Sequence, residues 1–397
     1  IFISDKNRSG RLNLAWPCAI LPAGALLIML RPNYPTAEID VVFFAEVLIA
    51  IAYAVYRSNS RACVLISLHD GVGVLLIASV ALWLVGFHTN VVYYFGKNVI
   101  TGGDRVLFPL TSTLAVAPTM CAAYIVASPI IMIATRRYRY FRVTALLAAV
   151  CISVQSDRRS ALFAIVFITV FVVAAPRVFR RLAPFIVGVA LTSPILVVTF
   201  PAMSVLSSFV TGLLMPLQRT NEDISTLNGR SGIWTNSLEY YQNQIDFLHQ
   251  LFGYGTFGQV KSGASSTYAS LFAGLRRDWA LKSPHSTVLQ VLFDGGWITA
   301  TAFLSVLICA AWVLARSVSS IDLAGLAMMT ALSFVGATEN TLAPHLTSIP
   351  FWMMTVIVTV AFSRESPLSN LHDVGAVANM TSDDRAHGEW QSINETS

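Results

Sequence analysis

Charged residues are scarce in this chain, and the motifs of familiar soluble enzymes are missing from it. Only 12% of the 397 residues are charged, whereas 55% are hydrophobic, and this balance excludes an ordinary soluble globular domain. The sequence has no P-loop, no GxGxxG fingerprint, no internal repeat and no His/Cys spacing typical of a metal site. We therefore expect neither a cofactor nor a bound metal.

Cysteine is also rare, and the basic excess is modest. The five cysteines all fall in apolar segments, so they indicate no disulfide framework and no metal cluster. The net charge is +5, which by itself would suggest nucleic acid as a partner. The basic residues gather in short connections between apolar runs, however, and such a distribution is typical of a membrane protein. We therefore expect no nucleic-acid partner.

Long apolar runs fill most of the sequence, and about 20 helical residues are enough to cross the hydrocarbon layer. They predict an all-α polytopic membrane protein with roughly ten transmembrane helices. The segment 106–134 contains three prolines, which indicate a kink or a partly re-entrant path. The predicted spans are 14–30, 41–56, 64–87, 106–134, 143–155, 161–176, 183–203, 296–315, 323–338 and 349–363.

The first residue is Ile1 rather than Met, so we expect the N-terminus to be trimmed or incomplete. The charged start, the apolar run and the AGA triplet at 23–25 resemble a signal peptide with its cleavage site. The apolar run is longer than the usual core of a signal peptide, which favours a retained span.

Basic connections set the expected orientation, because short loops rich in Lys and Arg stay in the cytoplasm. Such residues precede the first predicted span and follow the second, fourth and sixth, which alternates as the rule requires. Both termini are then inside. The expected division is an N-terminal group of spans over 1–203, a large external loop over 204–284, C-terminal spans over 285–363 and a disordered cytoplasmic tail over 364–397.

Two arginines oppose this charge trend. The sequence SDRRSALF at 156–163 forms an external turn, with Arg158 and Arg159 at the outer boundary of the membrane. Guanidinium groups present a planar fork of donors that suits phosphate oxygens, so converging arginines would suit a pyrophosphate. The alternative is a structural turn in which Arg158 pairs with Asp157 and reaches toward the interface.

The external loop carries further candidates. NGRSGIW at 228–234 places Arg230 just after an Asn-Gly turn, and it predicts an amphipathic helix lying along the membrane face. LFGYGTFG at 251–258 contains Tyr254 among glycines that permit tight backbone turns. Arg277 and Lys282 follow later in the loop, where a solvated basic face is the alternative to an anion site.

A histidine stands where this loop meets the next apolar run. In KSPHS, Ser283 suits an N-cap and Pro284 a first helical turn, so His285 is expected at a helix N-terminus that faces outward. The positive end of a helix dipole favours the neutral imidazole, which can accept a proton. A capping or interfacial histidine is the alternative. ENTLAPHLTS at 339–348 adds Glu339 and His345 on the same side, with turn capping as their alternative role. A carboxylate is the alternative to His285 as the base, and the external candidates are Asp157, Glu239 and Glu339.

The order and spacing of these motifs carry a family resemblance. SDRRSAL before a span, NGRSGIW and FGYG in a large loop, then PHS ahead of LQVLFDGGWI resemble the O-antigen polymerase and O-antigen ligase superfamily over roughly residues 150–315. Members often have Asn after the histidine and a single Gly after an acidic residue. Ser286 and the pair Gly295-Gly296 depart from that pattern.

The resemblance implies a GT-C-like glycosyltransferase of the bacterial inner membrane whose active site faces the periplasm. Its donor would be an undecaprenyl-pyrophosphate-linked oligosaccharide, used without a nucleotide sugar or an obligatory metal. Arg159 and Arg230 would bind the donor pyrophosphate, and His285 would activate the acceptor hydroxyl. Partners beyond the donor and the lipid bilayer would be a chain-length regulator and a flippase.

We therefore predict a polymerase that joins lipid-linked repeat units of a surface or secreted polysaccharide. An O-antigen ligase that transfers glycan to lipid A core is the alternative within the class, because its donor chemistry is the same. A transporter or flippase of an anionic lipid-linked substrate is a further alternative, and it would place charged residues near span midplanes. A structural membrane subunit would not need the outward arginines and histidine.

Overall fold

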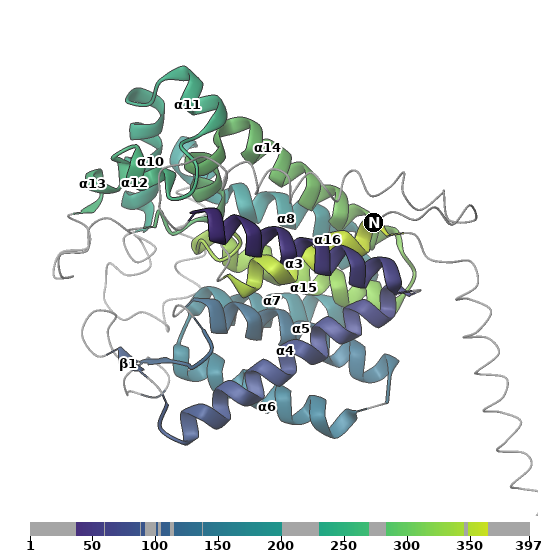
Figure 1. Ribbon diagram of the computed structural model, residues 1–397. Coiled ribbons are helices and arrows are strands. Elements are labelled where there is room, and N and C mark those ends of the chain that lie inside the picture. Colours follow the sequence, from purple (N-terminus) through teal and green to yellow (C-terminus); the bar gives the residue numbers. More distant parts are fainter. Residues whose placement is uncertain are drawn as a thin grey trace, which may run out of the picture.

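The computed structural model describes most of the chain from Ala37 to Ser363 and is helical apart from one small sheet. The described residues are 37–58, 60–87, 89–91, 101, 105–111, 115–136, 138–200, 230–269, 283–344 and 348–363. The predicted first span, the start of the external loop and the predicted tail lie outside them. The long helices run side by side in a bundle (Figure 1).

Each of the other predicted spans overlaps a helix. The long elements are α3 (Ala37–Arg57), α4 (Arg61–Leu84), α5 (Val116–Ala134), α6 (Arg139–Ser156), α7 (Arg159–Ala174), α8 (Pro176–Thr199), α14 (Thr287–Arg316), α15 (Ser320–Thr338) and α16 (Ile349–Phe362). Among the described residues, five of these helices (α4, α5, α8, α14 and α15) are long and apolar enough to cross a membrane, and the shorter apolar ones include α7 and α16. The all-α membrane fold is thus supported, while the number of spans stays a prediction.

The segment 106–134 is shorter as a helix than its hydropathy suggests. Strand β2 (Arg105–Leu107) pairs antiparallel with β1 (Thr89–Val91), and α5 begins only at Val116. Pro109 lies in the turn between β2 and α5, where its carbonyl accepts a hydrogen bond from Ser79 Oγ at 2.8 Å. Proline has no backbone N–H and interrupts a helix, but it is tolerated in a turn. This apolar stretch is therefore not continuously helical.

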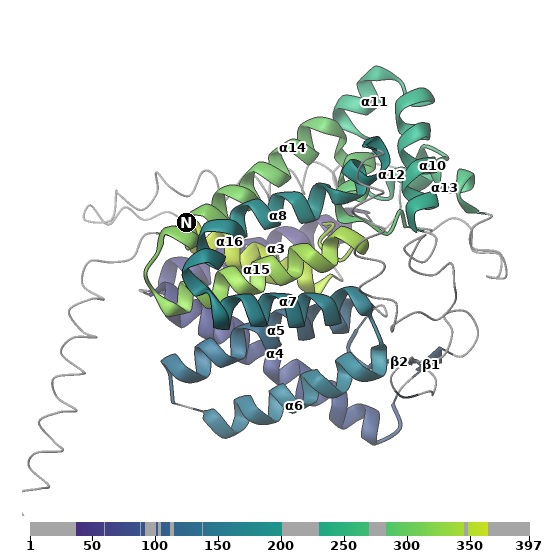
Figure 2. The ribbon, with the colours of Figure 1, turned by 180° about the vertical axis from the view of Figure 1, so that it is seen from behind.

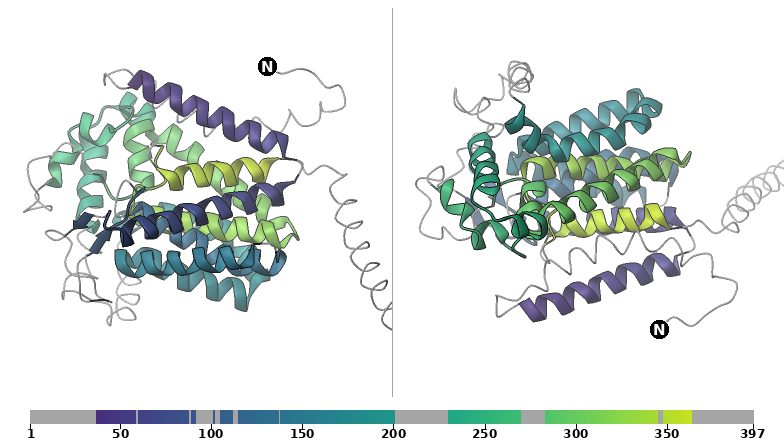
Figure 3. Two further views of the ribbon diagram at one scale, coloured as in Figure 1. Left: turned by 60° about the horizontal axis from the view of Figure 1, so that its bottom comes forward. Right: turned by 90° about the horizontal axis from the view of Figure 1, so that it is seen from above.

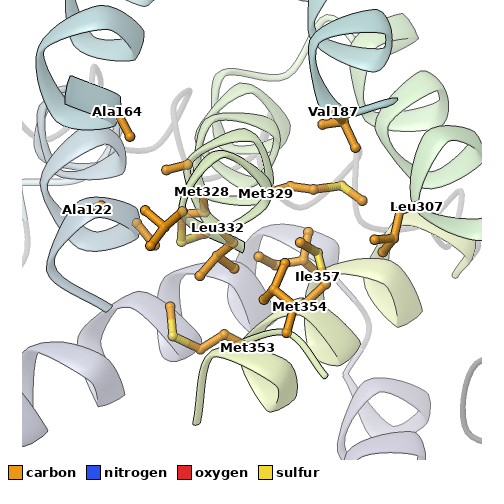
Figure 4. Close-up of a cluster of buried hydrophobic side chains, with 14 of the residues drawn as sticks. Ala122, Ala164, Val187, Leu307, Met328, Met329, Leu332, Met353, Met354 and Ile357 are labelled. Carbon is orange, nitrogen blue, oxygen red and sulfur yellow. The ribbon is translucent and has the colours of Figure 1, made fainter. Parts of the chain in front are cut away.

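Helix α15 lies at the centre of the bundle, surrounded by α5, α7, α8 and α14 (Figures 1 and 2). Nearly all of its residues are buried. Figure 4 shows Met328, Met329 and Leu332 of this helix packed among side chains of the neighbouring helices, including Ala122 of α5 and Val187 of α8. Small alanines on the facing helices let the backbones approach closely, as is typical of helix packing in membranes.

Four short helices gather at one end of the bundle, as both views of Figure 3 show. They are α10 (Arg230–Asn243), α11 (Phe247–Phe252), α12 (Gly258–Lys261) and α13 (Ala264–Thr267). We call them the end lobe. The N-termini of α7 and α14 and the C-terminus of α15 reach the same end, so the candidate residues of distant sequence motifs meet there.

Close backbone contact fixes the end lobe to α14. The backbone N–H groups of Tyr254 and Gly255 donate to the carbonyls of Phe293 and Asp294 at 2.9 and 2.8 Å. A Cβ on Gly258 would lie 2.1 Å from the carbonyl oxygen of Phe293. The glycines of LFGYGTFG therefore serve both turning and close approach, which larger residues would block.

Glycine in α14 also allows the backbones of α14 and the end lobe to approach closely. Gly296 has φ of +70°, and it interrupts the helix with a kink. A Cβ there would lie 2.2 Å from the backbone of Leu251. The Gly295-Gly296 pair, which departs from the pattern of the resembling family, is thus the place where the end lobe rests on α14.

Candidate functional site

Four of the residues singled out in the sequence meet at the lobe end of the bundle. Glu339 Oε1 accepts hydrogen bonds from Arg158 Nη1 at 2.8 Å and from Arg230 Nη2 at 2.5 Å. Its second oxygen, Oε2, lies 3.3 Å from Nδ1 of His285. Two guanidinium groups and an imidazole thus share one carboxylate, and we call these four residues the Glu339 cluster.

A tight turn between α6 and α7 presents Arg158. The C-cap of α6, Asp157, has φ of +45°, in the left-handed region that Asp tolerates better than most residues. Arg158 follows in extended conformation, and α7 then begins at Arg159. The turn directs Arg158 toward Glu339, the carboxylate with which it forms an ion pair at 2.8 Å.

Arg230 is the first residue of α10, and the packing of that helix fixes its position. Ile233, Trp234, Leu238 and Tyr241 of α10 are buried. The predicted amphipathic helix therefore exists, but its apolar face packs against the protein instead of lying along the membrane. This prediction was wrong because α8, α13 and α14 cover the face that the sequence alone leaves open.

His285 lies just before α14 and not in its first turn. The N-cap is Ser286, whose side chain accepts from the N–H of Leu289 at 3.4 Å. Ser283, which we predicted as the cap, instead accepts from the N–H of His285 at 3.0 Å. His285 has φ of +48°, which is incompatible with a first helical turn. Such strained backbone is found preferentially at functional sites.

Glu339 follows the last residue of α15, and a threonine ties its backbone to α14. Thr287 Oγ1 donates to the carbonyl of Glu339 at 2.9 Å and accepts from the N–H of Leu342 at 3.3 Å. The carboxylate is thereby held beside the residue that precedes α14, His285. Because Thr287 is fully buried, this link is shielded from competing water.

The carboxylate at the centre of the cluster is held in its ionised form. Burial acts to raise the pKa of the Glu339 carboxyl, but the positive charges of Arg158 and Arg230 and the hydrogen bond from His285 hold it well below its usual range. The carboxylate is thus ionised at neutral pH and is shared by two guanidinium groups. Arg158, Arg230 and His285 keep 15%, 14% and 27% of their side chains exposed, so all three can be reached from solution.

The remaining candidates are distributed around this cluster. Arg159 is half-buried at the start of α7. The ring of Tyr254 stacks on His249 with centroids 4.1 Å apart, within the end lobe. Arg277, Lys282 and His345 lie outside the described residues. Over the ranges that the structure describes, no group of three or more His, Cys, Asp or Glu residues is placed to hold a metal ion.

The central position of Glu339 was not evident from the sequence, which favoured a role in turn capping. The one available signal was its location, as an acidic residue directly after an apolar span on the side of the outward arginines. The resemblance favoured Arg159 as the pyrophosphate ligand, whereas the structure brings Arg158 to Glu339. Side-chain direction at a turn depends on φ and ψ of the turn residues, which sequence letters do not give.

The bundle and the Glu339 cluster define a multi-pass membrane protein with a cationic, histidine-containing site at one end. Residues 143–304 match the model of the family described as O-antigen ligase. This segment is therefore similar to the O-antigen ligase family, and the resemblance that its motifs carried is confirmed. The matched range contains Arg158, Arg230 and His285, while Glu339 lies beyond it.

No curated protein and no solved structure matches the chain. The family match indicates an activity of the O-antigen ligase or polymerase type and a glycosyltransferase-like enzyme. It does not distinguish the joining of repeat units from their transfer to another acceptor.

Proposed function

We propose that this protein is a glycosyltransferase that polymerises oligosaccharide repeat units carried on undecaprenyl pyrophosphate. The observation that carries the proposal is the convergence of Arg158, Arg230 and His285 on Glu339 at one end of an apolar bundle. A lipid pyrophosphate needs cationic donors beside a membrane, and glycosyl transfer needs a base beside them.

The arginines would act on the leaving group. When the glycosidic bond breaks, the lipid pyrophosphate gains negative charge, and guanidinium donors stabilise that charge more strongly in the transition state than in the ground state. Arg158 comes from the α6–α7 turn and Arg230 from α10, so their two forks approach from different directions. Arg159, at the same turn, would add a third donor.

His285 and Glu339 would form the base. Glu339 Oε2 is placed to accept a hydrogen bond from Nδ1 of His285, and a neutral imidazole that donates from Nδ1 keeps its acceptor lone pair on Nε2. Nε2 would take the proton of the acceptor hydroxyl as that oxygen attacks the anomeric carbon. The carboxylate would then stabilise the imidazolium that forms, in the manner of other His–carboxylate pairs.

The wider setting is part of the proposal. A GT-C-like fold of about ten spans, in the bacterial inner membrane with the Glu339 cluster facing the periplasm, would meet the donor where it is exposed. The division into N-terminal spans, a large periplasmic loop from 204 to 284, C-terminal spans and a cytoplasmic tail fits this arrangement. A flippase would supply the donor, and a chain-length regulator would limit the product.

The test is chain length, measured with purified protein and a lipid-pyrophosphate-linked repeat unit. His285→Ala and Arg230→Ala, at matched expression, are expected to lose long chains and to leave single lipid-linked units, with rates lower by about 10² to 10⁴. Lys261→Ala changes a basic residue of the end lobe outside the cluster and is the matched control. Normal chain lengths in both cluster variants would contradict this site.

The ligase is the second candidate, because the matched family is described as O-antigen ligase. Both reactions use the same donor, so the Glu339 cluster would serve either. Supplying lipid A core as the acceptor separates them. A ligase would transfer the glycan to the core and would not lengthen lipid-linked chains, whereas the polymerase would lengthen chains in the absence of the core.

A further inference from the structure

Helix α11 in the end lobe has its apolar side turned outward. Phe247, Leu248 and Phe252 are exposed by 69%, 65% and 48%. Of the two polar residues between them, Gln250 is turned inward and its side-chain N–H donates to a backbone carbonyl at 2.9 Å, whereas His249 is 43% exposed. Three large apolar side chains that face outward on one short helix are unusual for a helix surrounded by water.

The same helix is firmly fixed in this orientation. Asp246 caps it by accepting from the N–H groups of Leu248 and His249 at 3.1 and 3.2 Å. Tyr241 of α10 donates from its hydroxyl to the carbonyl of Gln250 at 2.6 Å. The outward direction of the apolar side chains is therefore a property of the packed lobe.

The exposed side of α11 continues onto a span. The end of α11 rests on the kink of α14 at Gly296, and Figure 1 shows α11 beside that end of α14. Directly after the kink come Trp297 and Ile298, exposed by 39% and 51%. We call Phe247, Leu248, Phe252, Trp297 and Ile298 the apolar wedge.

The kink also sets the level of the wedge in the membrane. From Trp297 to Arg316, α14 is long enough to span about 30 Å at 1.5 Å per residue, which matches the hydrocarbon layer. Trp297 then stands at one interface, where tryptophan is enriched, and Arg316 stands at the other. The ring of Tyr241 contacts that of Trp297 edge-on at 6.1 Å, so the lobe is at the level of the interface.

We propose that the apolar wedge inserts into the outer leaflet of the bilayer and is covered by lipid acyl chains. The end lobe, and with it Arg230 at the start of α10, is thereby held at the membrane surface. Continuity with the lipid-facing side of α14 identifies the occupant, because the wedge residues of α11 adjoin residues of a membrane span. The inference goes beyond the proposed activity and does not depend on it.

The depth of single spin-labelled side chains tests this. A nitroxide is attached at Leu248→Cys, in full-length protein whose Cys18, Cys63 and Cys309 are replaced by serine, reconstituted in bilayers of phosphatidylethanolamine and phosphatidylglycerol. The same triple-serine protein without an introduced cysteine is treated with the label, and its signal is subtracted to correct for labelling of the remaining native cysteines. Asn243→Cys, at an exposed polar position of the same lobe, is the matched control. For each labelled protein, the increase in the spin-relaxation rate of the nitroxide is measured with dissolved oxygen and with a water-soluble nickel complex.

We expect the label at 248 to be relaxed mainly by oxygen, at a depth of about 5–10 Å below the headgroup boundary, and the label at 243 mainly by nickel. Phe252→Cys is a second probe that is expected to behave as Leu248→Cys does. Equal access of nickel to positions 248 and 243 would overturn the proposal. So would low access of both reagents at 248, which would show that a second copy or another protein covers the wedge.

Discussion

Two groups of charged side chains lie near opposite ends of the bundle, and they differ in how many guanidinium groups share one carboxylate. Arg142, in the first turn of α6, forms a two-pronged ion pair with Asp70 of α4, both contacts being 2.8 Å. Arg158, just beyond the last turn of α6, shares Glu339 with Arg230. One guanidinium meets one carboxylate in the first group, whereas two meet one carboxylate in the second.

The arginine of the first group is enclosed by its neighbours. Arg142 is 1% exposed, and its Nη1 also donates to the carbonyl and hydroxyl of Thr135 at 3.1 Å. His69 contacts Asp70 at 3.2 Å and Ser128 at 3.0 Å. These bonds join α4, α5 and α6. A one-to-one pair with a buried arginine stabilises an arrangement of helices, while the Glu339 cluster, in which two partly exposed guanidinium groups share a carboxylate, is suited to bind an anion.

The largest effect is expected from breaking the pair of Asp70 and Arg142. Asp70→Asn leaves the buried Arg142 without a counter-charge, which costs about 3–5 kcal/mol, and thermal unfolding of the purified protein measures this loss. The combined change Asp70→Leu with Arg142→Met removes both charges and is expected to regain most of the stability. A single variant as stable as the parent would show that the pair has no structural role.

Glu339→Gln tests the cluster in which two arginines share one carboxylate. With the carboxylate neutral, the arginines and His285 lose their common anchor, and we expect the rate of chain growth to fall about 100-fold. Stability should fall less than in Asp70→Asn, because Arg158 and Arg230 are partly exposed. Glu239→Gln changes an exposed glutamate of α10 and should leave the rate unchanged. Full activity of Glu339→Gln would show that the cluster needs no anchor.

Inorganic pyrophosphate should distinguish the two groups as ligand sites. At a concentration about tenfold above its Kd, binding to the Glu339 cluster raises the free energy of unfolding by about 1.4 kcal/mol. The shift should disappear in Arg230→Ala and persist in the Asp70→Leu, Arg142→Met protein. If both variants kept the shift, the anion would bind elsewhere.

The smallest effect is a pH dependence. The pKa of Glu339 is lowered in the folded protein, so its contribution to stability is complete above the pKa of an unfolded glutamate, about 4.3, and is lost as the pH falls through the lower folded value. Acid unfolding followed below that pH should be steeper in the parent than in Glu339→Gln. Identical acid-unfolding profiles of the two proteins would show that folding does not lower the pKa of Glu339.

Much of the fold was predictable because hydropathy acts locally along the chain. Each predicted span within the described residues overlaps a helix, and 296–315 matches the part of α14 beyond its kink. Two helix starts were predicted wrongly because tertiary packing determines them. Helix α5 begins only at Val116, and the cap of α14 is Ser286. The order of the motifs predicted the family resemblance, which the match over 143–304 confirms.

The sequence by itself determined the membrane class, the family and the residue types of the site, since these depend on composition, apolar length and motif order. Tertiary structure alone decided that Glu339 joins Arg158, Arg230 and His285, because these residues lie 181, 109 and 54 positions from it. It also decided which apolar face is covered, burying that of α10 and leaving that of α11 exposed. Such pairings follow from how helices pack, and hydropathy does not encode which neighbour a helix will meet.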